Sequence, residues 1–299
     1  MTLVLAPEVR SALVEGRPVV ALETTLVAHG FPPGEGLDVA RECERIVREG
    51  GAVPATVGAL DGELRVGLTG AELEHFDASA RKAGPGDLAA CLAQRAVGAT
   101  TVGGTLVACR AAGVRVLGTG GIGGVHRSFP APPDVSADLG ALARTQAVVV
   151  CSGAKSLLDV TATVEALETL GVPLVGWRTD TLPRFYTAEG GPPLSARVES
   201  TGETARLAHA HWELGGAALV LAQPPPESLE ADELIEETLA ETRARGVVRA
   251  AVTPFVLARL HEASGGATLR VNRALILENV RLAAEVAVAL AERGAGSAS

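Results

Sequence analysis

Apolar residues along the chain follow two spacings. Short runs of branched aliphatic residues fit buried strands at residues 19–22, 53–60, 63–68, 114–117, 147–151, 173–176 and 217–222. Helical spacing occurs over residues 35–49, 87–97, 105–112, 139–144, 156–170, 203–213, 228–245 and 254–293. Strands that alternate with helices are typical of a layered α/β architecture. We therefore expect a three-layer α/β/α fold, with helices on both faces of a central sheet.

One turn signal indicates that this sheet is mixed. Asp61 and Gly62 separate two strand-like runs by two residues, which is typical of a tight hairpin between antiparallel neighbours. No linker or repeat divides the chain. We expect one domain over residues 1–299, with residues 294–299 as a flexible tail.

Charge and hydropathy exclude several classes of protein. The net charge is -9, whereas proteins that bind nucleic acid neutralise phosphates with clustered basic residues. Every apolar run is shorter than the roughly 18 residues needed to span a bilayer. The N-terminal run is too short for the core of a signal peptide and is interrupted by Pro7 and Glu8. We expect a cytoplasmic enzyme that contacts neither nucleic acid nor membrane.

The four cysteines are widely spaced and form no CxxC pair, namely Cys43, Cys91, Cys109 and Cys151. This spacing does not support a zinc ribbon or a redox motif. We expect reduced, buried thiols.

The basic residues are unevenly divided between lysine and arginine. Of 26 Lys plus Arg, only Lys82 and Lys155 are lysines. A lysine amine can lose its proton near neutral pH and form an imine with an aldehyde, whereas arginine cannot. The two lysines are therefore candidates for chemistry, although chance retention is the alternative.

Local sequence gives each lysine a different setting. Lys155, in CSGAKSLLD, follows the strand at 147–151 and opens the helix expected at 156–170. The positive end of a helix dipole disfavours an ammonium, which would lower the pKa of Lys155 and free its amine as a nucleophile. Lys82, in ARKAGPGD, precedes a Gly-Pro-Gly turn and a helix, a setting that suits a phosphate or carboxylate. Lys82 could equally be an exposed loop residue.

Glu23 ends the first strand in the run ALETT. The carboxyl ends of strands in α/β proteins point into the ligand crevice, and a desolvated carboxylate there would have a raised pKa suited to proton transfer. The alternative is a surface or salt-bridged carboxylate.

Residues 118–124 read GTGGIGG and open a long loop over residues 118–133. The match to a GxGxxG dinucleotide motif is formal, because prolines follow where that motif requires a helix. A glycine turn whose amides approach an anion, with His126 and Arg127 nearby, fits better. Purely structural glycines fit equally well.

Asp134 and Asp138 lie four residues apart after this loop. They could hold Mg²⁺ or Mn²⁺ through one carboxylate and several waters. Alternatively, Ser136 or Asp138 caps the helix expected at 139–144.

Several ordered blocks resemble one family over residues 4–293. These blocks are ALETTLVAHGFP, ARKAGPGDL, GATTVGGT, GTGGIGGVHR, DVSADL, CSGAKSLLD, TPFVLARLHEASGG and VNRALILENV. The chain resembles the pseudouridine-5'-phosphate glycosidases, which are related to indigoidine synthase A. The resemblance implies an α/β/α homotrimer that uses a divalent metal, typically Mn²⁺, to cleave pseudouridine 5'-phosphate into uracil and ribose 5-phosphate.

The resemblance also assigns roles to individual residues. It implies that Glu23 is the proton donor, that Lys155 attacks C1' of the sugar and that Asp134 binds the metal. Substrate-binding positions would be Lys82, Val102, Ser136, Ala137, Asp138, His126 and Asn272. Asn272 and Asn279 are the only asparagines in the chain.

The implied reaction accounts for an active-site amine. Pseudouridine joins ribose to C5 of uracil by a carbon–carbon bond, so the usual route with two carboxylates lacks a heteroatom leaving group. The resemblance implies that the ribose ring opens and that Lys155 forms an imine at C1', while Glu23 transfers protons. The chain departs from the family pattern at residues 84–86, 128–133 and 222–226.

Two other functions remain open from the sequence. One is a sugar-phosphate lyase or aldolase that uses Lys155 as a Schiff base. The other is a protein that binds sugar phosphates without catalysis.

Overall fold

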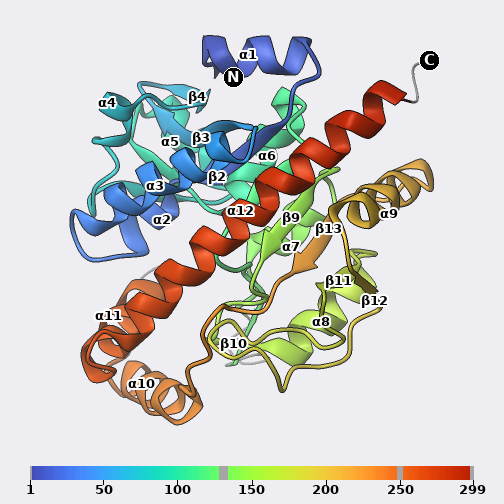
Figure 1. Cartoon of the computed structure of the whole chain (residues 1–299). Helices are drawn as coiled ribbons and strands as arrows, with labels where there is room; N and C mark the ends of the chain where they lie inside the picture. Colours follow the sequence, from blue (N-terminus) through green and yellow to red (C-terminus); the bar gives the residue numbers. More distant parts are fainter. Residues whose placement is uncertain (1, 128–133, 248–251, 297–299) are drawn as a thin grey trace.

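The computed structural model describes residues 2–127, 134–247 and 252–296, and its centre is an eleven-stranded sheet (Figure 1). The strands, in chain order, are β1 Thr2–Leu5, β2 Val19–Glu23, β3 Val53–Leu60, β4 Glu63–Val66, β5 Arg81–Ala83, β6 Gly98–Thr100, β7 Val116–Gly118, β9 Val148–Cys151, β11 Leu174–Trp177, β12 Ala196–Val198 and β13 Leu219–Ala222. Their main order in the sheet is β1-β4-β3-β2-β7-β9-β13-β11-β12, and β5 and β6 extend from β3. A separate antiparallel pair joins β8 Val125–His126 to β10 Leu158–Asp159.

Both parallel and antiparallel pairs occur in the main sheet, as expected. Strand β3 is antiparallel to β4 and β6, whereas β2, β7, β9, β13 and β11 run parallel. Leu60 pairs with Glu63 across the hairpin. Asp61 and Gly62 have φ values of 55° and 83°, the left-handed conformation that a two-residue hairpin requires at both central positions.

Helices cover both faces of the sheet. They are α1 Pro7–Val14, α2 Thr25–His29, α3 Glu35–Glu49, α4 Gly70–Leu73, α5 Leu88–Ala93, α6 Val102–Ala112, α7 Ala137–Leu142, α8 Val160–Thr169, α9 Thr201–Glu213, α10 Asp232–Ala244, α11 Val252–Ala263 and α12 Ala267–Gly296. Helices α3, α9 and α12 pack on one face, and α1, α6, α7 and α8 on the other. The long helix α12 crosses the sheet diagonally in Figure 1.

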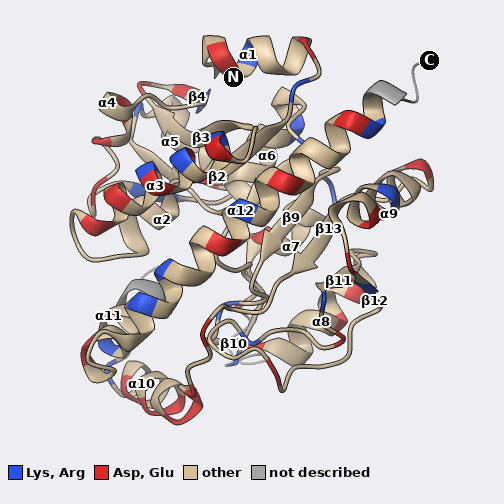
Figure 2. Cartoon of the chain, in the orientation of Figure 1, with Lys and Arg blue, Asp and Glu red and all other residues tan. Residues whose placement is uncertain are grey.

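Successive strand residues divide between two hydrophobic cores. In β9, Val148 and Val150 belong to the core beneath α12, whereas Val149 and Cys151 belong to the opposite core. This alternation follows from the two-residue period of a strand. The expected three-layer α/β/α fold is therefore confirmed. Figure 2 shows charged residues along outer helices such as α10, while β9 and β13 carry none.

The prediction that Lys155 opens a helix is wrong. Helix α8 begins five residues later, at Val160, because Asp159 is its N-cap and its carboxylate accepts a hydrogen bond from the Ala162 amide at 2.9 Å. Between β9 and α8 the chain forms a turn and the short strand β10. Lys155 therefore lies in a connection between strands, away from a helix dipole.

Caps and glycines also move other boundaries. Helix α6 starts at Val102, three residues earlier than expected, because the Thr101 hydroxyl accepts a hydrogen bond from the Gly104 amide. The C-terminal helical region is two helices, separated where Gly265 and Gly266 adopt positive φ. Helix α12 extends through residue 296, so residues 294–296 are helical where we expected a flexible tail. The last three residues of that expected tail lie outside the described residues, as does the departure at 128–133.

The four cysteines are buried and form no disulfide, as expected. Burial raises the pKa of the Cys43, Cys109 and Cys151 thiols to about 12. Among the described residues, every helix is too short or too polar to cross a bilayer.

Candidate active site

A cavity lies where several strands of the sheet end. Strand β2 ends at Glu23, β7 leads into Thr119, and the connection after β9 carries Lys155. Parallel strands place such ends at one edge, which is where ligands bind in open α/β sheets. Lys82 on β5 and Asn272 on α12 also line the cavity. The structure thus brings together four predicted residues from separate segments, Glu23, Lys82, Lys155 and Asn272.

Glu23 is a buried carboxylate with one free oxygen. The residue is only 6% exposed, and the Thr119 hydroxyl donates a 2.5 Å hydrogen bond to Oε1 of Glu23. Its Oε2 is buried and has no hydrogen-bond partner in the described part of the chain. Burial raises the pKa of Glu23, although the positive charges of Lys155 and Lys82 and the bond from Thr119 act in the opposite direction. Glu23 is not the exposed or salt-bridged residue that was the alternative.

Neither lysine forms an ion pair or a side-chain hydrogen bond with the described residues. Burial lowers the pKa of Lys82, and the nearby charge of Lys155 lowers it further, while Asp138, Glu23 and Asp134 oppose this shift. The backbone of Lys155 is fixed because its amide donates to the Ile122 carbonyl at 3.1 Å. Two unpaired amines therefore face one cavity.

The glycine-rich loop is built for close packing. A Cβ atom on Gly123 would lie 2.2 Å from the Ser136 hydroxyl, and one on Gly121 would lie 2.8 Å from the Phe185 ring. The Gly123 amide donates to Asp138 Oδ2 at 2.9 Å and is therefore not available to an anion. At Gly123, the alternative of a glycine with a purely structural role is therefore the one that fits. Gly120 and Gly121 nevertheless line the cavity.

Asp138 is also buried, at 4% exposure, and it joins three segments. Its Oδ1 accepts from the Gly103 amide at 2.7 Å and the Thr101 hydroxyl at 3.2 Å, while Oδ2 accepts from Gly123. The Ser136 hydroxyl accepts from the Asp138 amide at 3.2 Å. Ser136 therefore caps α7, which begins at Ala137, two residues earlier than expected.

Four predicted substrate-binding residues, Val102, Ser136, Ala137 and Asp138, lie beside the cavity and do not line it. Val102 is the first residue of α6, next to Gly103, and Ser136, Ala137 and Asp138 open α7. Contact with Gly103 and Gly123 makes Asp138 a link between α6 and the glycine loop. Their roles in binding substrate stay predictions.

His126 and Asp134 form a second polar group near Lys82. His126 Nδ1 lies 3.8 Å from Asp134 Oδ2, and burial lowers the pKa of His126 while Asp134 opposes that shift. No group of three or more His, Cys, Asp or Glu side chains gathers anywhere in residues 2–127, 134–247 and 252–296. One carboxylate and one imidazole fit a divalent ion that keeps most of its waters, and not a full protein cage.

Comparison with known proteins identifies the family. The family of indigoidine synthase A like proteins matches residues 8–289. The chain belongs to this family. It is 45% identical to the pseudouridine-5'-phosphate glycosidase of Sorangium cellulosum, over 99% of this chain and 96% of that protein. It is 48% identical to the enzyme of the same name from Symbiobacterium thermophilum, over 95% of this chain and 96% of the relative.

Two solved structures share the fold. The prealnumycin C-glycosynthase AlnA, in complex with ribulose 5-phosphate, superposes with a TM-score of 0.89 at 40% identity, over 99% of both chains. An indigoidine synthase A-like protein from Thermotoga maritima gives a TM-score of 0.88 at 38% identity, over 97% of both chains.

Three residues that hold the site in place were not predicted as site residues, namely Thr119, Ser152 and Asn279. Asn279 is fully buried, and its amide donates to the Thr119 carbonyl at 2.9 Å and to the Ser152 hydroxyl at 3.1 Å. It therefore ties the ends of β7 and β9, from which Thr119 and Lys155 approach the cavity. Its retention as one of only two asparagines was the available signal. Nothing in the sequence pairs Thr119 with Glu23, 96 positions away.

Proposed function

We propose that this protein cleaves the carbon–carbon glycosidic bond of pseudouridine 5'-phosphate, producing uracil and ribose 5-phosphate. The observation that carries this proposal is the convergence of two unpaired lysines and a buried carboxyl with a raised pKa at one cavity. Relatives that carry this activity in their names are 45% and 48% identical over nearly the whole chain.

The amine supplies what a carboxylate pair would lack. The ribose ring opens as the C1'–O4' bond breaks and Nζ of Lys155 bonds to C1', and O4' takes the proton that the nitrogen loses. The bond between C1' and C5 of uracil then breaks while C5 takes the proton of Glu23 and the electrons of nitrogen form a C1'=N imine. Water hydrolyses the imine and releases ribose 5-phosphate with regeneration of the amine. Each step can run in reverse, so the same residues would also join uracil to ribose 5-phosphate.

The surroundings of Glu23 suit a proton donor. Burial keeps its carboxyl protonated at a pH where an exposed glutamate is ionised, and the Thr119 hydroxyl holds one oxygen. The other oxygen, Oε2, is buried and has no partner among the described residues, and Glu23 lines the cavity.

We assign Lys82 to the phosphate and Asp134 to a divalent ion. The negative charge of a nearby phosphate would favour the charged form of Lys82, whose pKa is lowered by burial. Asp134 would hold Mn²⁺ through one carboxylate oxygen, and the bound ion would supply local positive charge. The homotrimer implied by the family resemblance and the cytoplasmic location expected from the sequence also stay predictions.

The decisive assay measures uracil release from pseudouridine 5'-phosphate with Mn²⁺, and then with a chelator. The wild-type protein should release uracil, and Lys155→Ala should lose at least about a thousandfold in kcat because the nucleophile is gone. Lys155→Arg is the matched control, since it keeps the charge but forms no imine, and it should be equally inactive.

Uracil release separates the two enzymes, because borohydride would trap a lysine adduct in both. A trapped adduct with ribose 5-phosphate but no uracil release would favour the lyase or aldolase. Binding of sugar phosphate that Lys155→Ala leaves unchanged, with no turnover, would favour the non-catalytic protein.

A further inference from the structure

The walls of the cavity differ in chemistry according to the elements that form them. Strand ends and their connections contribute polar groups, including Glu23, Thr119 and Lys155. Helices α2, α11 and α12 and the segment after β11 contribute apolar side chains, namely Leu26, Leu257, Ile276 and Phe185. The polar wall suits a sugar phosphate, and the apolar wall suits a part of the ligand with a flat, uncharged surface.

Phe185 holds its place in this wall at a cost in backbone energy. Its φ is +65°, a left-handed value that bulky residues rarely adopt and that costs on the order of 1 kcal/mol or more. The Phe185 amide donates to the Ser152 carbonyl at 3.1 Å, so the segment is pinned to the end of β9. The neighbouring Arg184 and Tyr186 amides are also bonded, to Thr187 and Arg184. Glycine would adopt this φ without strain. The strain is therefore the cost of placing an aromatic ring at this position.

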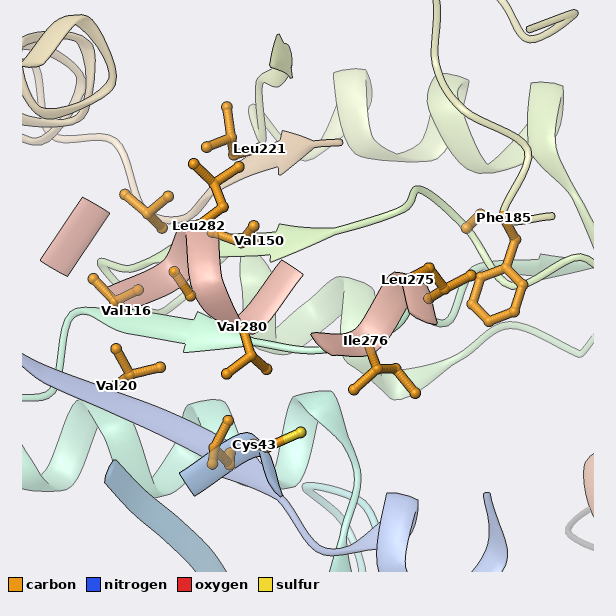
Figure 3. Packing of buried hydrophobic residues seen from close by; sticks show 14 of the residues in the cluster. Val20, Cys43, Val116, Val150, Phe185, Leu221, Leu275, Ile276, Val280 and Leu282 are labelled. Atoms are coloured by element: carbon orange, nitrogen blue, oxygen red, sulfur yellow. The ribbon is translucent and has the colours of Figure 1, made fainter. Parts of the chain in front are cut away.

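The ring lies against the glycine loop. A Cβ on Gly121 would come within 2.8 Å of both Cδ2 and Cε2 of Phe185, so only glycine lets the ring approach the backbone here. The Tyr186 ring also packs against the Phe185 ring, with the ring planes nearly perpendicular and the centroids 4.9 Å apart. In Figure 3, Phe185 lies beside Leu275 at one end of the cluster, beyond the side chains around Val116 and Val150. Its position is thus at the boundary between core and cavity.

Asn272 supplies a polar group beside this apolar wall. It is 5% exposed and lines the cavity, and its amide has no hydrogen-bond partner within the described residues. The amide faces the cavity, where water can pair with it in the free protein, so a ligand that replaces this water gains about 0.5–1.5 kcal/mol per hydrogen bond. An amide offers both a donor and an acceptor, which matches the alternating N–H and C=O groups on the edge of a pyrimidine.

We propose that Phe185, with Leu257 and Ile276, forms a subsite for the planar base and that Asn272 pairs with the edge of that base. This inference rests on the proposed function and extends it, because it assigns recognition of uracil to residues that do not act on the sugar. Phe185 is thereby a specificity-determining residue. The base contacts the part of the Phe185 side chain that lines the cavity, and the sugar phosphate extends toward Lys155 and Lys82.

The test uses the reverse reaction, in which uracil and ribose 5-phosphate are separate substrates. In Phe185→Leu, the KM for uracil should rise about tenfold or more, since base–aromatic contacts are worth about 1–3 kcal/mol. The KM for ribose 5-phosphate should stay within about twofold, and borohydride should still trap ribose 5-phosphate on Lys155. Phe185→Gly, which relieves the strained φ, is a second variant and should show the same split. Tyr186→Phe is the matched control and should leave both constants unchanged.

A parallel rise in both KM values, or an unchanged KM for uracil, overturns the base subsite while the proposed function stands. If the wild type forms no pseudouridine 5'-phosphate, the proposed function fails instead. Calorimetry then decides the subsite, because wild-type protein should bind pseudouridine 5'-phosphate more tightly than ribose 5-phosphate and Phe185→Leu should lose that preference. Equal affinities in the wild type would overturn it.

Discussion

Two buried carboxylates, Glu23 at the end of β2 and Asp138 at the start of α7, differ in their hydrogen bonds. Asp138 accepts three bonds, two of them from backbone amides, and these satisfy both oxygens. Glu23 accepts one, from Thr119, and its second oxygen has no partner among the described residues. Glu23 and Asp138 are almost equally buried, at 6% and 4% exposure.

Burial by itself therefore does not indicate whether a carboxylate is catalytic. A carboxylate surrounded by amide donors is stabilised in its charged form and holds the fold together. One that lacks donors favours its neutral form and keeps a proton to give away. The proposed division of labour, with Glu23 in chemistry and Asp138 in support, follows from this difference and can be broken by substitution.

The largest expected effect is on turnover in Glu23→Gln. Glutamine keeps the shape of the side chain but has no acidic proton, so kcat should fall by about 10²–10⁴-fold. The rate of uracil release measures this. Glu44→Gln is the matched control, because burial also raises the pKa of Glu44, yet its carboxylate accepts a hydrogen bond from Thr56 and does not line the cavity. Equal loss of activity in both variants would contradict the role of Glu23.

Glu23→Gln should also be more stable than the wild type at neutral pH. The pKa of Glu23 is raised in the folded state, so folding binds its proton more tightly than the unfolded chain does. The stability of the wild type therefore falls as pH rises from the ordinary value of 4.5 through the raised one. Urea unfolding should show a gain for Glu23→Gln above that window, and none below it. A loss of stability at neutral pH would show that the charged form is favoured.

Asp138→Asn tests the other carboxylate, through stability. One end of the new amide is an NH₂ group that must face backbone N–H donors from Gly103 or Gly123. The free energy of unfolding should fall by about 3 kcal/mol, which urea denaturation measures. Asp134→Asn, at a carboxylate whose side chain is 41% exposed, should change it by less than about 0.5 kcal/mol. Similar small changes in both would mean that the three bonds to Asp138 contribute little.

Lys82 lies near both carboxylates, and its own charge should determine KM for the phosphate substrate. Burial lowers its pKa, so its ammonium loses a proton as pH rises through that lowered value, and KM for the phosphate substrate should then increase. Lys82→Arg should abolish this alkaline rise, since arginine stays charged. Lys82→Ala should raise KM about tenfold at neutral pH with a smaller effect on kcat. Kinetics from neutral to alkaline pH measure both, and a pH-dependent KM in Lys82→Arg would exclude Lys82 as the titrating group.

The smallest effect is expected for Thr119→Val, which removes the single hydrogen bond to Glu23. Because that bond lowers the pKa of Glu23, its loss should raise the pKa further. The decline of kcat/KM as Glu23 ionises should move to higher pH by about one unit or less. Thr105→Val, at a buried threonine bonded to Thr100, is the control and should leave the profile in place. A shift to lower pH in Thr119→Val would mean that Thr119 favours the protonated form.

Hydrophobic periodicity was sufficient to predict the layers. Runs such as 147–151 and 217–222 have apolar residues at successive positions because both faces of the strand are buried, and the structure confirms them as β9 and β13. Composition drew attention to Lys82 and Lys155, and position at a strand end to Glu23. The start expected for the helix at 156–170 was wrong, because the Asp159 cap outweighed the apolar pattern of the preceding residues and the helix begins at Val160.

By itself, then, the sequence determined the α/β/α layers and the residue types able to do chemistry, since both depend on local periodicity and on side chains. Only the tertiary structure decided which carboxylate is satisfied, because the donors to Asp138 come from positions 35 and 15 residues away. The tertiary structure alone placed Phe185, with its strained φ, against Gly121, which has no Cβ to block the ring. Such contacts join segments that are distant in sequence, and local patterns carry no signal for them.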